Sequence, residues 1–258
     1  MKNILLILLI VFSILSCEIR EEYTFNKDGS GVYEMVLDFS DFMKMKEEKD
    51  STMFDQKIDT IIDFAVLLEE KRDSIAQLPE EEQARLQSLK PLKFEMKVND
   101  TTKQMLMNLR YDFTDISELE KFAETIEKAN IKELDELSGT EDPQQNTMSD
   151  SLQPTNSGLF EMASSFHTNF SSKKFSRKIT DKARQEALKT KDTTMVSDDP
   201  FADMIKFKQV FRFPFRVKAV DNEKARILSD FKGIELEVNM YDLNKNPDIF
   251  NVEVLFEK

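Results

Sequence analysis

The sequence has few of the residues on which many active sites are built. Its 258 residues include one Cys (Cys17), one His (His167), no Trp and only five Gly. A single Cys excludes an internal disulfide and any Cys-rich zinc or iron–sulfur site. A single His excludes metal centres with several His ligands, and five Gly leave little room for phosphate-binding loops. We therefore expect neither a metal nor a cofactor.

Positive charge is also scarce. The chain carries 36 Lys and Arg against 49 Asp and Glu, a formal net charge of −13. Because nucleic-acid binding depends on clustered Lys and Arg, this balance argues against nucleic acid as a partner. The average hides an uneven distribution, since residues 173–218 contain 13 basic and 6 acidic side chains.

One alternating segment of this basic region is a candidate contact surface. Residues 206–220 predict a strand with Phe207, Phe211, Phe213 and Phe215 on one side and Lys206, Lys208, Arg212, Arg216 and Lys218 on the other. Pro214 predicts an edge strand or a bulge. The basic side could contact anionic lipid headgroups, at about 1 kcal/mol per well-placed Lys or Arg. The alternatives are internal balance against the acidic helices and a plain solvated strand face.

The first 17 residues, MKNILLILLIVFSILSC, combine Lys2 with an unbroken apolar run at 4–12. This run is too short to cross a bilayer core of about 30 Å, which needs roughly 20 residues. It is typical of an export signal that is removed from the mature protein.

The signal ends in Ile14-Leu15-Ser16-Cys17, which resembles the lipobox of bacterial lipoproteins. The resemblance implies removal of residues 1–16, a diacylglycerol on the Cys17 thiol and acylation of the new amino group. Two or three acyl chains anchor a protein stably, whereas one holds it weakly. The alternative is an ordinary signal peptide with a chance Cys. We expect a lipid-anchored protein of the cell envelope, at the outer rather than the inner membrane.

The apolar periodicity predicts an α+β fold of antiparallel hairpins, with a helical hairpin inserted between strands and further helices packed on one face. The expected strands are residues 18–26, 32–39, 92–98, 105–113, two within 158–179, 206–220, 224–228, 234–240 and 251–256. The expected helices are 41–48, 51–78 and 80–89, one from Asp115 or Ser117 to 137, and 181–189.

Residues 139–157 are polar and contain Pro without apolar periodicity, which predicts a loop or a disordered linker. We expect one composite domain over residues 17–258, because the strands on either side are too few for separate sheets. A division into two domains at this linker is the alternative.

Three further patterns contain residue types that could support binding or catalysis. Residues 26–32 match the start of a calcium loop, but the twelfth position is Leu37 instead of Glu, so a hairpin turn is favoured. His167 is expected to face solvent without a partner or nucleophile. The acidic runs at 69–70, 80–82 and 198–199 are expected to be solvated faces and helix starts.

Residues 23–35, YTFNKDGSGVYEM, follow the lipobox closely and carry a second resemblance. Together they resemble a group of uncharacterised lipoproteins of Bacteroidetes-type bacteria, and also the LppM-like lipoprotein domain. Residues 211–222 and 246–256 are similar to the closing strands of that group. The likeness covers both ends of the chain better than its middle. It implies an envelope lipoprotein and carries no active site.

We therefore predict a non-enzymatic, lipid-anchored envelope protein that binds another envelope component, either a protein or a lipid. One alternative is a carrier or chaperone that holds a hydrophobic ligand between sheet and helices. A weaker alternative is an envelope hydrolase.

Overall fold

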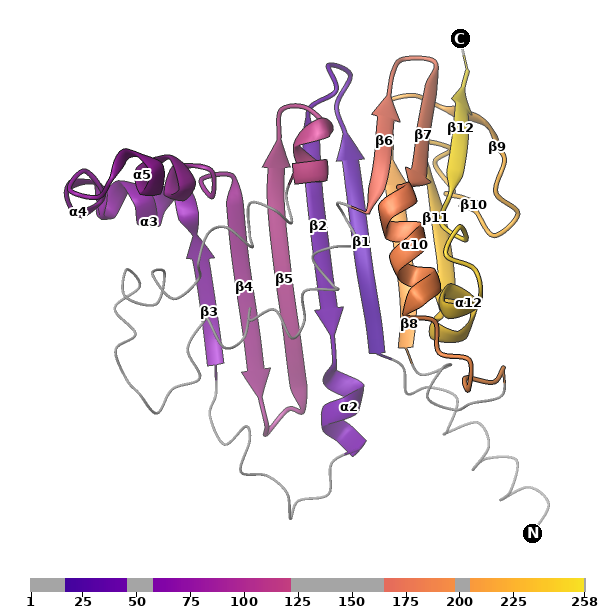
Figure 1. Cartoon of the computed structure of the whole chain (residues 1–258), viewed down its shortest axis with the longest axis horizontal. Coiled ribbons are helices and arrows are strands. Elements are labelled where there is room, and N and C mark those ends of the chain that lie inside the picture. Colours follow the sequence, from indigo (N-terminus) through magenta and orange to yellow (C-terminus); the bar gives the residue numbers. More distant parts are fainter. Residues whose placement is uncertain (1–16, 46–57, 122–164, 198–204, 258) are drawn as a thin grey trace.

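The computed structural model describes residues 17–45, 58–121, 165–197 and 205–257. Within them the predicted α+β class is confirmed, as two sheets with helices at their edges and over one face (Figure 1). The larger sheet, sheet A, has the strand order β10-β11-β8-β1-β2-β5-β4-β3. Its strands, in chain order, are β1 (Cys17–Phe25), β2 (Gly31–Asp38), β3 (Ile58–Asp63), β4 (Leu92–Asn99), β5 (Gln104–Phe113), β8 (Ile205–Arg212), β10 (Arg226–Ile227) and β11 (Gly233–Asn239).

The smaller sheet, sheet B, has the order β6-β7-β12-β9. Its strands are β6 (Phe166–Phe170), β7 (Lys174–Ile179), β9 (Val217–Val220) and β12 (Val252–Phe256). The helices are α2 (Ser40–Met45), α3 (Phe64–Glu70), α4 (Arg72–Ile75), α5 (Glu80–Gln87), α10 (Asp181–Lys189) and α12 (Met240–Lys245).

The two hairpins predicted with the clearest alternation are confirmed. β1 pairs with β2 across the turn at residues 26–30, and Tyr23 lies opposite Tyr33. β4 pairs with β5, and Phe94 lies opposite Leu109. In β1, β2 and β4 every second side chain is buried, and in β5 the same alternation begins at Leu109, because one face of sheet A is covered and the other is not.

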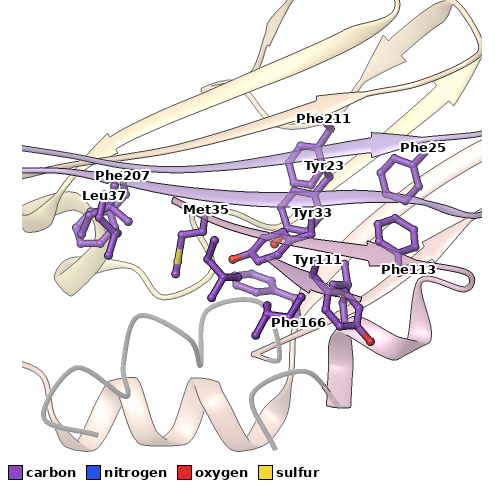
Figure 2. Packing of buried hydrophobic residues seen from close by; sticks show 14 of the residues in the cluster. Tyr23, Phe25, Tyr33, Met35, Leu37, Tyr111, Phe113, Phe166, Phe207 and Phe211 are labelled. Carbon is purple, nitrogen blue, oxygen red and sulfur yellow. The ribbon is translucent and has the colours of Figure 1, made fainter. Parts of the chain in front are cut away.

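Sheet B packs on the inner face of sheet A through aromatic side chains. Phe175 of β7 lies 4.9 Å from Phe211 of β8 and 5.5 Å from Phe25 of β1, measured between ring centroids. Figure 2 shows the sheet A side of this contact, where the Tyr23 ring stacks on Phe211 and lies tilted against Tyr33. The buried side chains of both sheets form one continuous cluster.

The helix predicted over residues 51–78 is confirmed in part within the described residues, since 64–70 and 72–75 are helical but 58–63 are not. Residues 58–63 form β3, paired with β4, and the helices α3 and α4 follow only from Phe64 onward. The sequence IDTIID satisfies both periods, because its Ile residues fit a helical stripe and its alternate residues fit a strand. The exposed edge of β4 decides between them, since it offers backbone partners that a helix could not use. The segment predicted to be an inserted helical hairpin is therefore a strand followed by short helices.

The strand predicted over residues 206–220 is also corrected. It is broken at Pro214: β8 ends at Arg212 in sheet A, and the chain resumes as β9 in sheet B. Pro214 cannot donate to a ladder, so it marks the crossing between sheets. β8 itself is a central strand between β11 and β1, not an edge strand.

The remaining predictions divide into three groups. The helices at 80–89 and 181–189 are confirmed as α5 and α10, and a short helix begins at Ser40 as α2. α12 was not predicted, because the strand expected over residues 234–240 was extended to Met240. In the structure Asn239 caps this helix, and its side chain accepts from the Asp242 N–H at 2.8 Å. The helix from Ser117 lies outside the described residues beyond 121, as do the signal at 1–16 and the loop at 139–157.

Candidate functional site at the Cys17 end of sheet A

Cys17 is the first residue of β1, so the folded sheet begins at the residue expected to carry the lipid. Its side chain is buried and shares the inner face with Ile19, Glu21 and Tyr23. β8 runs parallel to β1 on one side, with Ile205 level with Cys17 and Phe207 level with Ile19. Both strands therefore begin at the same end of sheet A (Figure 1).

Within the described ranges, no helix has the length and apolar character that crossing a membrane requires.

A pocket lies at this end of the sheet, between α10 and α12. It has a volume of about 280 Å³. Its walls are apolar, with Phe207 from β8, Ala183 and Ala187 from α10, and Met240 and Leu243 from α12. The rest of its lining is Ser165, Phe166, Ile179, Thr190, Asn244, Pro247 and Phe250. This α10–α12 pocket has the composition of a site for an apolar ligand with a few polar groups at its border.

The structure gives carboxylate partners to three of the five predicted basic contacts. Lys208 Nζ lies 3.0 Å from Glu235 and 3.7 Å from Glu237 of the neighbouring β11. Arg212 pairs with Glu22 of β1, and Arg216 Nε lies 3.1 Å from Glu257. The acidic partners come from neighbouring strands and the C-terminal end, so this geometry favours the internal-balance alternative.

The basic residues are also spread along the sheet instead of gathering at the anchor. Lys206 is level with Glu18, next to Cys17, but Arg212 is level with Thr24. At about 3.3 Å per residue, Arg212 lies about 23 Å along the strand from the Cys17 end. Arg216 and Lys218 follow Arg212 in the chain after β8 ends, and Lys218 is exposed.

A buried ionic cluster joins the two sheets behind the pocket, and the sequence patterns did not single it out. Glu21 of β1 is fully buried. It accepts hydrogen bonds from the hydroxyls of Tyr23 at 3.1 Å and Tyr33 at 2.8 Å, and from Gln209 Nε2 at 2.6 Å. Arg177 of β7, also fully buried, places Nη2 3.7 Å from the same carboxylate. The cluster pairs a buried negative charge with a buried positive one.

Aromatic rings surround the Arg177 guanidinium. Its central carbon lies 4.2 Å from the Phe166 ring centroid, 4.6 Å from that of Tyr23 and 5.7 Å from that of Phe211. The ring faces attract the cation, most strongly where water is excluded. Phe166 also lines the α10–α12 pocket, so one ring separates the pocket from the ionic cluster.

Burial changes the acidity of the two Tyr residues in this cluster. Loss of solvent raises the pKa of Tyr23 well above its ordinary value, and the Arg177 charge opposes that rise. Loss of solvent also raises the pKa of Tyr33, and the neighbouring Glu21 charge adds to the rise. Both hydroxyls therefore keep their protons and act as donors to Glu21.

His167 is exposed on β6, as expected, but it does have a partner. Its Nδ1 lies 3.3 Å from Glu120 Oε1, which corrects the prediction of a strand His without one. The pair is open to solvent, with 65% of the His167 side chain exposed. In the ranges that the structure describes, no three His, Cys, Asp or Glu side chains come together as a metal site.

The Gly-rich segment after β1 forms a hairpin turn, as its sequence predicts, and not a calcium loop. The Asn26 N–H donates to the Ser30 carbonyl at 2.8 Å, and Gly29 has a φ of 92°. Asp28 accepts from both the N–H and the hydroxyl of Ser30, and these bonds lower the pKa of the Asp28 carboxyl. Its carboxylate is therefore engaged within the turn.

A second hollow, of about 490 Å³, lies beside α3 and the start of β4. Its lining is largely charged, and two of its side chains have structural roles. Lys93 Nζ pairs with Asp63 at 2.7 Å, and Asp63 also caps α3 by accepting from the Ala65 N–H at 3.1 Å. The α10–α12 pocket is therefore the better candidate for an apolar ligand.

No family model matches the sequence, and no curated protein matches it. Among solved structures, the chain has a distant structural resemblance to the folded domain of the lipoprotein LppM from Mycobacterium tuberculosis. The TM-score is 0.38 and the sequence identity 9%, over 95% of this chain and 92% of that chain. The resemblance to Bacteroidetes-type lipoproteins stays a prediction.

Proposed function

We propose that this protein is a non-enzymatic lipoprotein of the bacterial envelope, anchored by lipid on Cys17, that binds another envelope component, a protein or a lipid. The observation that carries the proposal is the start of β1 at Cys17, directly after the lipobox-like residues 14–16. No spacer separates the modified residue from the sheet. The lipid would therefore hold the Cys17 end of sheet A against the membrane surface.

The first test is mass spectrometry of the N-terminal peptide of the mature protein from a bacterial host. The expected result is cleavage before Cys17 and a mass increase corresponding to two or three acyl chains. The Cys17→Ser variant should lose this mass, because no thiol remains to accept the diacylglycerol. An unmodified Cys17 thiol in the wild type would overturn the anchor.

The second test addresses the partner and the membrane. Crosslinking of the lipidated protein in cells should capture a specific envelope protein or lipid, and fractionation should place the protein in the outer membrane. An enzyme would give a different result: the purified protein would convert an envelope substrate even when none of the captured partners is present. The His167→Ala variant is the control, because it removes the exposed His167–Glu120 pair and should leave the captured partners unchanged.

A carrier of an apolar ligand is the second candidate, and the α10–α12 pocket favours it. A carrier should release a stoichiometric lipid when the purified protein is denatured in a mass spectrometer. A partner-binding protein without a ligand should release none.

A further inference from the structure

We propose that the α10–α12 pocket receives one acyl chain of the lipid on Cys17, so that the domain shelters part of its own anchor. This inference rests on the lipidation proposed above. It assigns the pocket an occupant that is already attached to the chain, in place of a ligand collected from elsewhere.

The first support is the position of Cys17. Its side chain lies on the inner face of β1, the face that α10, α12 and sheet B cover. Phe207 of the pocket is one strand away and two residues along. Since neighbouring strands are about 4.8 Å apart and rise about 3.3 Å per residue, Phe207 lies about 8 Å from Cys17.

The second support is the position of the pocket's outer rim. Asn239, the last residue of β11, is level with Lys206, which is level with Glu18. Met240 follows it as the first residue of α12, so this helix begins at the Cys17 end of sheet A. Two strand spacings, about 10 Å, separate β11 from β1. Met240 is 37% exposed and lines the pocket, which places a flexible apolar side chain at the pocket's border.

The third support is size. An apolar cavity of about 150 Å³ is enough for a molecule of benzene. The α10–α12 pocket, at about 280 Å³, has room for a segment of one acyl chain. It falls just below the range of about 300–1,000 Å³ typical of sites for whole small molecules. The room exists because α10 presents Ala183 and Ala187 there instead of larger side chains.

The consequence concerns orientation at the membrane. Of three acyl chains, one in the pocket leaves two in the bilayer, and two chains still anchor stably. A chain held between α10 and α12 adds a second attachment to the domain besides the bond at Cys17. The Cys17 end of sheet A would then keep a fixed face toward the bilayer instead of swinging about one residue.

The test is photocrosslinking in the full lipidated protein, made in a bacterial host and analysed by peptide mass spectrometry. A photoreactive phenylalanine analogue replaces Leu243, which lines the pocket, or Lys245, which is exposed on the same helix. The position-243 peptide should be joined to the acylated N-terminal peptide, and the position-245 peptide should not. Crosslinks from position 243 to free phospholipid, to another segment of the chain or to another protein would overturn the inference.

A filling variant provides the second arm. Ala187→Phe should occupy the pocket and reduce the 243 adduct about tenfold or more, whereas Gln185→Phe on the exposed side of α10 should not. Ala183→Leu serves where Ala187→Phe fails to fold, as judged by circular dichroism. An unchanged adduct in a folded filling variant would contradict the pocket as the chain's location.

The same spectra separate this inference from the proposed function. A Cys17 peptide without lipid removes both. A lipidated Cys17 peptide without the 243 adduct removes only the assignment of the pocket and leaves the anchored protein in place.

Discussion

Glu21 lies in a correctly predicted strand, but its buried ionic contacts were not predicted. Its position was visible in the sequence, because it shares the inward phase of Ile19, Tyr23 and Phe25. A carboxylate in that phase is expected to be paired, since an unpaired buried charge is very costly. Its partners could not be read from the sequence, because Gln209 is 188 residues away and Arg177 lies in the other sheet.

Removal of the Glu21 carboxylate should therefore be strongly destabilising. Glu21→Ala leaves Arg177 buried without its charge partner, which typically costs about 3–5 kcal/mol of unfolding free energy. The matched control is Glu22→Ala in the same strand, whose carboxylate faces outward to Arg20 and Arg212. That change should cost less than about 1 kcal/mol. Urea denaturation measures both, and equal losses would contradict a structural role for the cluster.

The two buried Tyr residues predict an alkaline limit to stability. Their pKa values are raised in the folded state above the unfolded value of about 10. The unfolded chain therefore releases these protons first, so their contribution is complete below about pH 10 and is lost as the pH rises toward the folded values.

Urea denaturation at several pH values should show the free energy of unfolding falling above about pH 10. The fall per pH unit should be smaller in the double variant Tyr23→Phe, Tyr33→Phe. Tyrosinate absorbance should show that these two residues ionise only as the protein unfolds. Early ionisation of all four Tyr residues in folded protein would contradict their burial.

At the scale of elements, local pattern was sufficient where one period dominated. β4 and β5 alternate without competition, and α10 has a cap in Thr180, whose hydroxyl accepts from the Ala183 N–H at 3.2 Å. β3 was mistaken because IDTIID fits both periods, and Ile61 ends 70% exposed on the outer face. Pairing with β4, not local propensity, selects the strand there.

The β1–β2 hairpin should be sensitive to a single methyl group. A Cβ on Gly31 would lie 2.2 Å from the Thr24 carbonyl oxygen and 2.4 Å from the Phe113 ring. Gly31→Ala should therefore cost about 3 kcal/mol in thermal unfolding, by forcing strand and ring apart. Gly29→Ala, where a Cβ meets nothing within 4 Å but φ is positive, should cost only about 1–2 kcal/mol. The opposite order of costs would contradict the hairpin packing.

At the scale of the whole molecule, the charges that looked separated along the sequence are interleaved in space. Lys208 lies between two Glu of β11, and Arg212 meets Glu22 of β1. These ion pairs argue against a separate basic face along β8, although residues 173–218 contain more basic than acidic side chains.

This interleaving predicts weak binding to anionic membranes once the lipid is absent. The full-length Cys17→Ser protein should sediment with anionic vesicles no more than with zwitterionic ones. The paired variant Lys206→Gln, Lys218→Gln, which alters the two basic residues without changing the ion pairs above, should behave the same. Salt-sensitive binding to anionic vesicles that this variant abolishes would restore the contact surface first predicted.

Several features of this protein follow from local chemistry and can be read directly from its residues. These are the short apolar leader and lipobox-like ending at Cys17, the alternating hairpins, the turn at residues 26–30, and the lack of Cys and His for a metal centre. Each depends on a few consecutive residues, or on composition alone.

The contacts between distant segments, in contrast, depend on how the whole chain packs. The tertiary structure placed β8 parallel to β1, closed the α10–α12 pocket beside Cys17, buried Glu21 against Arg177, and gave the basic residues of β8 acidic neighbours. Pairing between remote strands is set by burial of their apolar faces against the whole core, and no local period encodes it. The role proposed for Cys17 therefore rests on two observations, namely the residues that precede it in the sequence and the pocket that the fold builds near it.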